Sequence, residues 1–126
     1  MDKRRTKRYS ISDYLDKIVS KEEYYIDILI NGSIRAILID ISMCGLGYRI
    51  EEIDPERLKE LQIPGDMLIK LYIADVVLFA EMKKVWTALI EDKGKKIIKG
   101  GLSFNVISVE DRLNLSNCIE NIRKRI

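Results

Sequence analysis

The 126-residue sequence contains no histidine, only two cysteines and two prolines, and no long hydrophobic run. Without histidine, neither a Ser-His-Asp triad nor a Cys-His pair nor any histidine-containing metal site can form. Cys44 and Cys118 lie far apart and outside any C-x-x-C, so we expect two buried thiols and neither a zinc site nor a disulfide framework. The remaining Asp, Glu, Lys and Ser residues form no recognisable catalytic motif. We therefore predict a non-enzymatic binding protein without a metal or a cofactor.

The chain also lacks the segments that direct a protein into or across a membrane. Its apolar stretches fall short of the ~18 to 20 residues that span a bilayer, and no apolar core follows the basic N-terminus, as a secretory signal would require. The length and the 47% hydrophobic content fit a single domain with its own core. We expect a cytoplasmic protein that does not insert into membranes.

Positive charge is scarce in the body of the chain and concentrated at its start. Residues 1–8 carry five bases and one acid, a local charge of +4, whereas the remaining 118 residues, with 17 bases and 19 acids, have a charge of −2. A body of this charge argues against a phosphate-tracking nucleic-acid groove. The N-terminal arm is instead predicted to seek a compact anion.

Most of the sequence has the pattern of an antiparallel β protein. Asn31-Gly32 between two β-branched runs predicts a hairpin, and the segment 91–94 predicts a second turn. The expected strands are 24–30, 34–41, 46–50, 67–74, 76–90 and 95–107. Because closure removes aggregation-prone edges, six strands of this length favour a small closed barrel.

Three helices are predicted around these strands. Helical spacing of apolar residues indicates a short amphipathic helix over 12–23, and Asp54-Pro55 is a good start for a helix over 56–62. A capping box at 108–111 opens a terminal helix. The face that this last helix is expected to bury consists of Val109, Leu113, Ser116, Ile119, Ile122 and Ile126.

Three motifs resemble those of the PilZ domain family. Arg4 to Arg8 form an R-x-x-x-R in the basic arm, Asp40 to Gly45 form a D-x-S-x-x-G after the second strand, and Gly101 to Phe104 form a G-x-x-F. The resemblance covers residues 1–8 and 24–126. It implies an all-β-dominated fold, a six-stranded antiparallel PilZ-type β-barrel with a C-terminal α-helix.

The resemblance also implies a division of the chain into two parts within a single domain. Residues 1–23 hold the basic arm and a short N-terminal helical insertion, and residues 24–126 hold the barrel and its C-terminal helix. The insertion departs from the family, in which the arginine motif leads quickly into the first strand.

The implied ligand is cyclic di-GMP, which presents two phosphates and two guanine edges. Arg4 and Arg8 are the expected ligand arginines, since the guanidinium fork matches both phosphate and guanine. Asp40 is expected to accept hydrogen bonds from guanine N1–H and N2–H, and Ser42 to add a hydroxyl contact to the base or a phosphate. Gly45 is expected to supply a left-handed backbone angle or a close approach to the ligand.

Four further residues are secondary candidates for the same site. Lys3 and Arg5 are expected to contact phosphate, and Gly101 opens the G-x-x-F motif. Trp86, the only tryptophan, would either stack on a guanine face or pack in the core.

These residues predict a non-catalytic bacterial cyclic di-GMP receptor or adaptor of the kind that regulates motility or biofilm formation. On binding, the arm changes conformation and the signal passes to a protein partner that the sequence does not identify. Two alternatives stay open. One is a PilZ-like interaction protein that binds no nucleotide, and the other is a small-barrel nucleic-acid-binding protein. The body charge argues against the second, so no nucleic-acid partner is expected.

Overall fold

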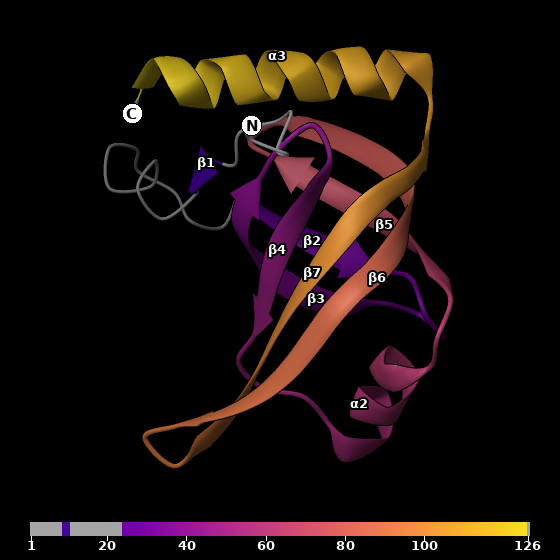
Figure 1. Cartoon of the computed structure of the whole chain (residues 1–126), viewed down its shortest axis with the longest axis vertical. Helices are drawn as coiled ribbons and strands as arrows, with labels where there is room; N and C mark the ends of the chain where they lie inside the picture. Colours follow the sequence, from indigo (N-terminus) through magenta and orange to yellow (C-terminus); the bar gives the residue numbers. More distant parts are fainter. Residues whose placement is uncertain (1–8, 11–23, 126) are drawn as a thin grey trace, which may run out of the picture.

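The computed structural model describes residues 9–10 and 24–125, which form strands and two helices (Figure 1). The strands are β1 (Tyr9–Ser10), β2 (Tyr24–Ile28), β3 (Ile34–Ile41), β4 (Gly45–Ile50), β5 (Asp66–Ile73), β6 (Val76–Asp92) and β7 (Lys95–Ile107). The helices are α2 (Pro55–Gln62) and α3 (Val109–Arg125). The helix expected over 12–23 lies outside the described residues.

Six of the strands close into an antiparallel barrel, which confirms the predicted fold. The order is β3-β2-β5-β6-β7-β4, and β4 pairs with β3 to close the ring. The two-residue β1 lies beside the end of β3, with Tyr9 opposite Ile41 and Ser10 opposite Asp40. At this end β3 therefore pairs with β4 on one side and with β1 on the other.

Alternation along the strands turns the apolar side chains inward. Hairpin turns permit this register, because Asn31 and Gly32 both adopt positive φ angles, as do Lys93 and Gly94. The largest fully buried side chains are Tyr48, Ile26, Ile28, Leu38, Ile41, Leu46, Leu61, Ile69, Leu71, Leu78 and Met82.

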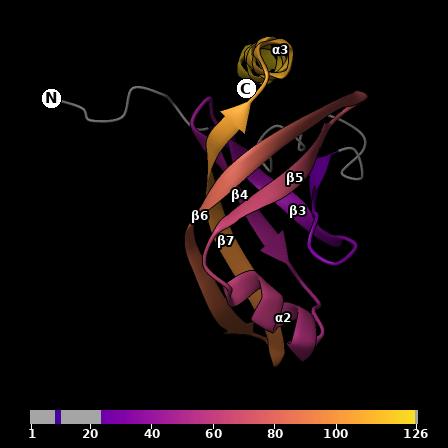
Figure 2. The same ribbon diagram turned by 90° about the vertical axis from the view of Figure 1, so that its right-hand side faces the viewer.

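The two helices lie at opposite ends of the barrel (Figures 1 and 2). The N-cap of α2 is the predicted one: the Asp54 side chain accepts a hydrogen bond from the Glu56 amide at 3.3 Å, and Pro55 takes the first helical position. Leu61 is fully buried, so α2 contributes to the core at its end of the barrel.

At the other end, α3 begins as the capping box predicts, but it presents a different face. The Ser108 hydroxyl accepts a hydrogen bond from the Asp111 amide at 3.0 Å. The predicted stripe was wrong in its first half, since Val109 is 78% exposed and Leu113 62% exposed. The helix packs through its second half, where the buried side chains are Leu115, Cys118, Ile119 and Ile122. Ile119 and Ile122 are buried as predicted, whereas the predicted Ser116 is exposed and Ile126 lies outside the described residues.

The two cysteines differ in burial. Cys118 is buried in α3, and burial raises the pKa of its thiol. Cys44 is exposed in the loop between β3 and β4, so the expectation that it is buried was wrong. A loop position outside the hydrophobic alternation explains the difference.

Over residues 9–10 and 24–125, no helix is long and apolar enough to cross a membrane. The same part of the chain contains no group of three or more His, Cys, Asp or Glu residues that could hold a metal ion.

Candidate functional site

Register across four strands brings three of the predicted site residues into one line. Asp40 on β3 pairs with Gly47 on β4, Gly47 pairs with Gly101 on β7, and Gly101 pairs with Trp86 on β6. Neighbouring strands lie about 4.8 Å apart, so this line extends roughly 14 Å along the barrel wall. We call these four residues the glycine row.

The glycine row lies on the outside of the barrel. Leu46 and Tyr48, the neighbours of Gly47, are fully buried, and so is Leu102, which follows Gly101. Because side chains alternate along a strand, the intervening glycines face outward. Both glycines are nevertheless buried, because the Asp40 side chain lies against Gly47 and the Trp86 indole lies against Gly101.

At one end of the row, Gly47 makes room for the Asp40 carboxylate. A Cβ at Gly47 would lie 3.0 and 3.1 Å from the two carboxylate oxygens, closer than ordinary van der Waals contact. A register shift between Leu38 and Asp40 marks a bulge that re-aims this end of β3. The carboxylate is therefore held over the backbone of β4 and is partly buried. The sequence analysis missed the role of Gly47.

At the other end, Trp86 lies across Gly101. A Cβ at Gly101 would come within 2.3 Å of the indole Nε1, so only glycine admits the ring at this position. The side chain of Trp86 is 49% exposed. This exposure rules out the alternative that Trp86 packs in the core. A register shift between Lys84 and Trp86 places a second bulge at this end of the row.

Ser42 organises the loop that follows β3. Its side chain is buried, and the hydroxyl oxygen accepts hydrogen bonds from the amides of Cys44 at 3.1 Å and Gly45 at 3.2 Å. The Ser42 amide donates to the Gly45 carbonyl at 2.9 Å. These bonds form a turn of the kind that serine hydroxyls stabilise, and they direct the hydroxyl into the loop rather than toward the outer surface.

Gly45 is required by packing against β7. A Cβ there would lie 2.1 Å from the Leu102 carbonyl oxygen and 3.1 Å from the Ser103 Cα. Gly45 is not among the described residues with positive φ, so the expected left-handed angle was wrong. A Cβ at position 45 would block the approach of the neighbouring strand β7, not of the ligand. Glycine therefore allows β4 and β7 to pair closely.

Basic side chains border the glycine row, a feature that the net charge of the body conceals. The pairs Arg49–Lys99 and Ser103–Lys83 flank the row on its two sides, in outward-facing register positions. Arg49 Nε lies 3.6 Å from Glu51 Oε1, and Lys83 is exposed. Strand alternation around Gly47 and Gly101 could have located these cations once the pairing of β4 with β7 was known.

The arginine motif itself lies outside the described residues, as do the secondary candidates Lys3 and Arg5. The segment that carries Arg4 and Arg8 joins the described chain at Tyr9. Through β1, Tyr9 pairs with Ile41 and the next residue pairs with Asp40. The described chain thus begins beside the acidic end of the glycine row.

The chemistry of this surface suits a flat, anionic heteroaromatic ligand. A carboxylate accepts paired N–H donors, an exposed indole offers a π face, and the two glycines let both side chains lie close to the barrel wall. Cations on both sides would attract phosphate. Nothing in the described part of this surface supplies a nucleophile with a neighbouring base.

No protein-family model matches the sequence, and no curated protein matches it either. Solved structures do match. "PilZ domain with c-di-GMP of YcgR from Escherichia coli" superposes with a TM-score of 0.65 at 18% identity, covering 98% of this chain and 93% of that chain. The Bacillus subtilis inhibitor of motility MotI/DgrA gives 0.66 at 14% identity, covering 100% of this chain and 54% of that one. The K. pneumonia MrkH-c-di-GMP complex gives 0.67 at 16% identity, covering 98% and 54%.

The closed six-stranded barrel with its terminal helix is thus the PilZ-type fold, which confirms the fold expected from the motifs. The chain spans nearly all of the YcgR domain but only about half the length of MotI and MrkH.

Proposed function

We propose that this protein is a non-catalytic receptor for cyclic di-GMP and binds it on the glycine row. The observation that carries the proposal is the line Asp40–Gly47–Gly101–Trp86, which sets a carboxylate and an exposed indole against two glycines in one row. The YcgR PilZ domain and MrkH, which have a similar fold, were solved in complex with this ligand. A role in motility regulation is part of the proposal, by analogy with the inhibitor of motility MotI/DgrA.

Each group has a stated task in the proposed complex. Asp40 accepts hydrogen bonds from guanine N1–H and N2–H, and Trp86 stacks on a guanine face. Gly101 and Gly47 keep the floor free of side chains. Arg4 and Arg8 contact the phosphates and the guanine edge, with Lys3 and Arg5 as secondary phosphate contacts.

Ser42 and Gly45 act in this proposal through the loop. The hydrogen bonds of the Ser42 hydroxyl fix the turn after Asp40, and Gly45 holds β4 against β7. Both residues thereby position the carboxylate relative to the glycine row. This role explains a D-x-S-x-x-G spacing without requiring the hydroxyl to contact the ligand.

The arm (residues 1–8) is the proposed relay. Bound phosphate favours the state in which Arg4 and Arg8 dock near Asp40, and a protein partner recognises that state. Docking changes the surface presented by the N-terminal part, residues 1–23, relative to the barrel part, residues 24–126. The chain then acts as an adaptor.

Titration calorimetry with cyclic di-GMP tests the receptor. Arg4→Ala and Arg8→Ala should each weaken binding by about 1.5 to 3 kcal/mol, the usual contribution of a charge-assisted contact. Arg112→Ala, an exposed arginine of α3 away from the glycine row, should bind as the wild type does. Absence of binding to the wild-type protein would favour the PilZ-like interaction protein, and normal binding by both arm variants would remove the arginine assignment.

Asp40→Asn tests guanine recognition separately from phosphate attraction. An amide presents one acceptor and one mismatched donor to two guanine donors. The variant should lose preference for cyclic di-GMP over cyclic di-AMP, measured as the ratio of the two dissociation constants. An unchanged ratio would show that Asp40 serves only the turn.

Limited trypsin digestion tests the relay, because Arg4, Arg5, Lys7 and Arg8 are cleavage sites. Saturating cyclic di-GMP should slow cleavage there. Lys93, exposed in the β6–β7 turn, provides an internal control whose cleavage should be unaffected. Equal cleavage of the arm with and without ligand would exclude docking as the mechanism.

A further inference from the structure

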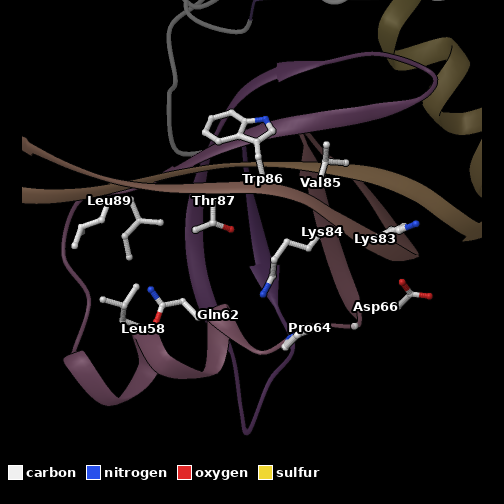
Figure 3. A pocket seen from close by; sticks show the side chains of 12 residues that line it. Leu58, Gln62, Pro64, Asp66, Lys83, Lys84, Val85, Trp86, Thr87 and Leu89 are labelled. Carbon is white, nitrogen blue, oxygen red and sulfur yellow. The ribbon is translucent and has the colours of Figure 1, made fainter.

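A cavity lies beside β6 at the Trp86 end of the glycine row, and Trp86 is among the residues that line it. It has a volume of about 470 Å³ and opens between α2 and the middle of β6 (Figure 3). This volume falls in the range of small-molecule sites. Its lining includes the side chains of Leu58, Gln62, Lys84, Thr87, Leu89 and Ile98.

Lys84 is the cation of this cavity. Figure 3 shows its side chain extending from β6 into the space above α2, toward Gln62 and Pro64. The ammonium donates a hydrogen bond to the Ile63 carbonyl at 2.8 Å. Its neighbour Lys83 points away from the cavity centre in the same view. Consecutive lysines therefore serve opposite faces of the strand.

No carboxylate neutralises Lys84 within residues 9–10 and 24–125. No ion pair of this lysine is found there, and burial alone lowers the pKa of its ammonium. Asp66, the acid that lines the cavity, accepts a hydrogen bond from Asn105 at 2.6 Å. A partly buried cation without a counter-charge is unfavourable unless an anion reaches it.

The rest of the cavity is suited to an apolar body. Leu58, Leu89 and Ile98 line the wall, and Leu89 is half exposed at the rim. The Thr87 hydroxyl is buried in the wall and has no hydrogen-bond partner among the described residues. An apolar cavity with one cation and few other polar groups selects for an amphipathic anion.

The geometry points to a binding site for a small amphipathic carboxylate, with its anionic group on the Lys84 ammonium and its apolar body against Leu58 and Leu89. Charge complementarity decides the class of ligand, because the cavity offers a cation and its only lining acid is already hydrogen-bonded. The site adjoins the glycine row, since Trp86 also lines the cavity, but the anion contact at Lys84 does not require nucleotide binding.

The bulge in β6 links the two sites physically. The register shift between Lys84 and Trp86 allows the lysine to enter the cavity while the indole lies on the outer wall over Gly101. Lys84 and Trp86, two residues apart, extend to opposite sides of β6 in Figure 3, although both of them line the cavity, as Thr87 does. A ligand at Lys84 would contact the same strand segment that supports the proposed stacking ring.

Octanoate, with 1-octanol and octylammonium as matched probes, tests the site on the full chain by ¹H–¹⁵N NMR titration. Octanoate should give saturable shifts centred on Lys84, Thr87 and Leu58. Octanol should bind at least about tenfold more weakly, since it lacks the charge-assisted contact, and octylammonium more weakly still. Equal affinity for octanoate and octanol, or shifts centred elsewhere, would overturn the proposal.

Variants locate the anion. Lys84→Met should lower octanoate affinity by about tenfold or more and leave octanol affinity unchanged, whereas Lys84→Arg should retain octanoate. Lys59→Met, at an exposed position of α2 that does not line the cavity, is the matched control and should bind octanoate normally. If Lys84→Met fails to fold, Leu89→Asp, a substitution at a half-exposed rim position, should abolish octanoate binding by repulsion. Octanoate binding unaffected by either variant would overturn the assignment.

Discussion

The wall formed by β4, β7 and the middle of β6, which we call the glycine wall, can be compared with the wall formed by β2, β5 and the beginning of β6. On the second wall, Tyr25 and Tyr72 stack with ring centroids 4.3 Å apart. The Arg35 guanidinium lies 4.1 Å from the Tyr25 centroid, and Lys70 Nζ lies 5.0 Å from the Tyr72 centroid and 5.7 Å from that of Phe79. We call these five residues the aromatic ladder.

The Tyr25–Tyr72 pair of the aromatic ladder is closed to an incoming ring because its two rings are covered. Tyr25 has Arg35 on one face and Tyr72 on the other, and Lys70 lies against Tyr72. Asp27 holds Arg35 in place with two hydrogen bonds, and this pairing raises the pKa of the guanidinium. Phe79, at the end of the ladder, is 48% exposed and therefore as accessible as Trp86 at 49%. The candidate site is distinguished by the Asp40 carboxylate in line with the exposed ring, rather than by ring exposure alone.

The largest expected effect comes from adding a Cβ at Gly45, where the backbones of β4 and β7 are in direct contact. In Gly45→Ala, the new Cβ would lie 2.1 Å from the Leu102 carbonyl oxygen, and neither strand can yield without breaking their pairing. We expect the free energy of unfolding to fall by about 3 kcal/mol, measured by urea denaturation.

Gly47→Ala is the matched control. Its Cβ would meet only the Asp40 side chain, at 3.0 to 3.2 Å, and this side chain can shift by a few tenths of an ångström. The loss of stability should therefore be much smaller than for Gly45→Ala. Equal losses would show that the close approach of β4 and β7 is not what selects glycine at position 45.

The next effect concerns binding rather than stability. Trp86→Ala should weaken cyclic di-GMP binding by about 1 to 3 kcal/mol, the usual contribution of stacking between a base and an aromatic ring. Gly101→Ala should also weaken binding, because a Cβ 2.3 Å from the indole Nε1 forces the ring to move. Calorimetry measures both effects, and thermal unfolding should change little because the ring is half exposed. Unchanged affinity in Trp86→Ala would exclude the stacking role.

Tyr72→Ala makes the reverse comparison on the aromatic ladder. It removes a stacked ring and one partner of Lys70, so stability should fall by about 1 to 2 kcal/mol. Cyclic di-GMP affinity should stay at the wild-type value, since β5, which carries Tyr72, contributes no residue to the glycine row. A loss of affinity with retained stability would transfer the site to this wall.

Much of the fold was predictable because its determinants are local. Asn31-Gly32, Asp54-Pro55 and Ser108 fix a turn and two helix starts, and all three behave as expected. The buried face of α3 was misplaced because two stripes in that helix have the same period. Only the position of the barrel end selects the stripe containing Leu115 and Cys118.

The candidate site was predictable in its motif residues but not in its arrangement. Asp40 and Trp86 are 46 positions apart in the sequence, and only the pairings of β3 with β4, of β4 with β7 and of β7 with β6 bring them into one row. Gly45 was assigned to the motif correctly but for the wrong reason, because the clash that selects it comes from Leu102, 57 positions away. Arg4 and Arg8 stay predictions.

The smallest effect at neutral pH is expected on the inner side of the glycine wall. Tyr48 is fully buried with its ring against Gly100, where a Cβ would come within 2.3 Å of the phenol. Neither its hydroxyl nor that of Thr87 reaches the geometry of a full hydrogen bond within the described residues, but the two lie close enough for Thr87 to lower the pKa of the phenol in part. Tyr48→Phe removes an unpaired buried hydroxyl and should change stability by less than about 0.5 kcal/mol at pH 7.

At alkaline pH the same variant should separate from the wild type. Burial raises the pKa of Tyr48, an effect that Thr87 offsets only in part, so the unfolded chain loses the phenolic proton at a lower pH than the folded chain does. The folded state therefore binds more protons, and wild-type stability should decline as pH rises above about 10, the ordinary tyrosine value. The Tyr48→Phe variant has no phenolic proton to lose, so its stability should decline less over the same pH range. Urea denaturation of both proteins from pH 7 to 11 measures the difference, in which all other titrating groups cancel. Parallel curves would show that the phenol reaches water from inside the barrel, and the inner side of the glycine wall would then be as open as its outer side.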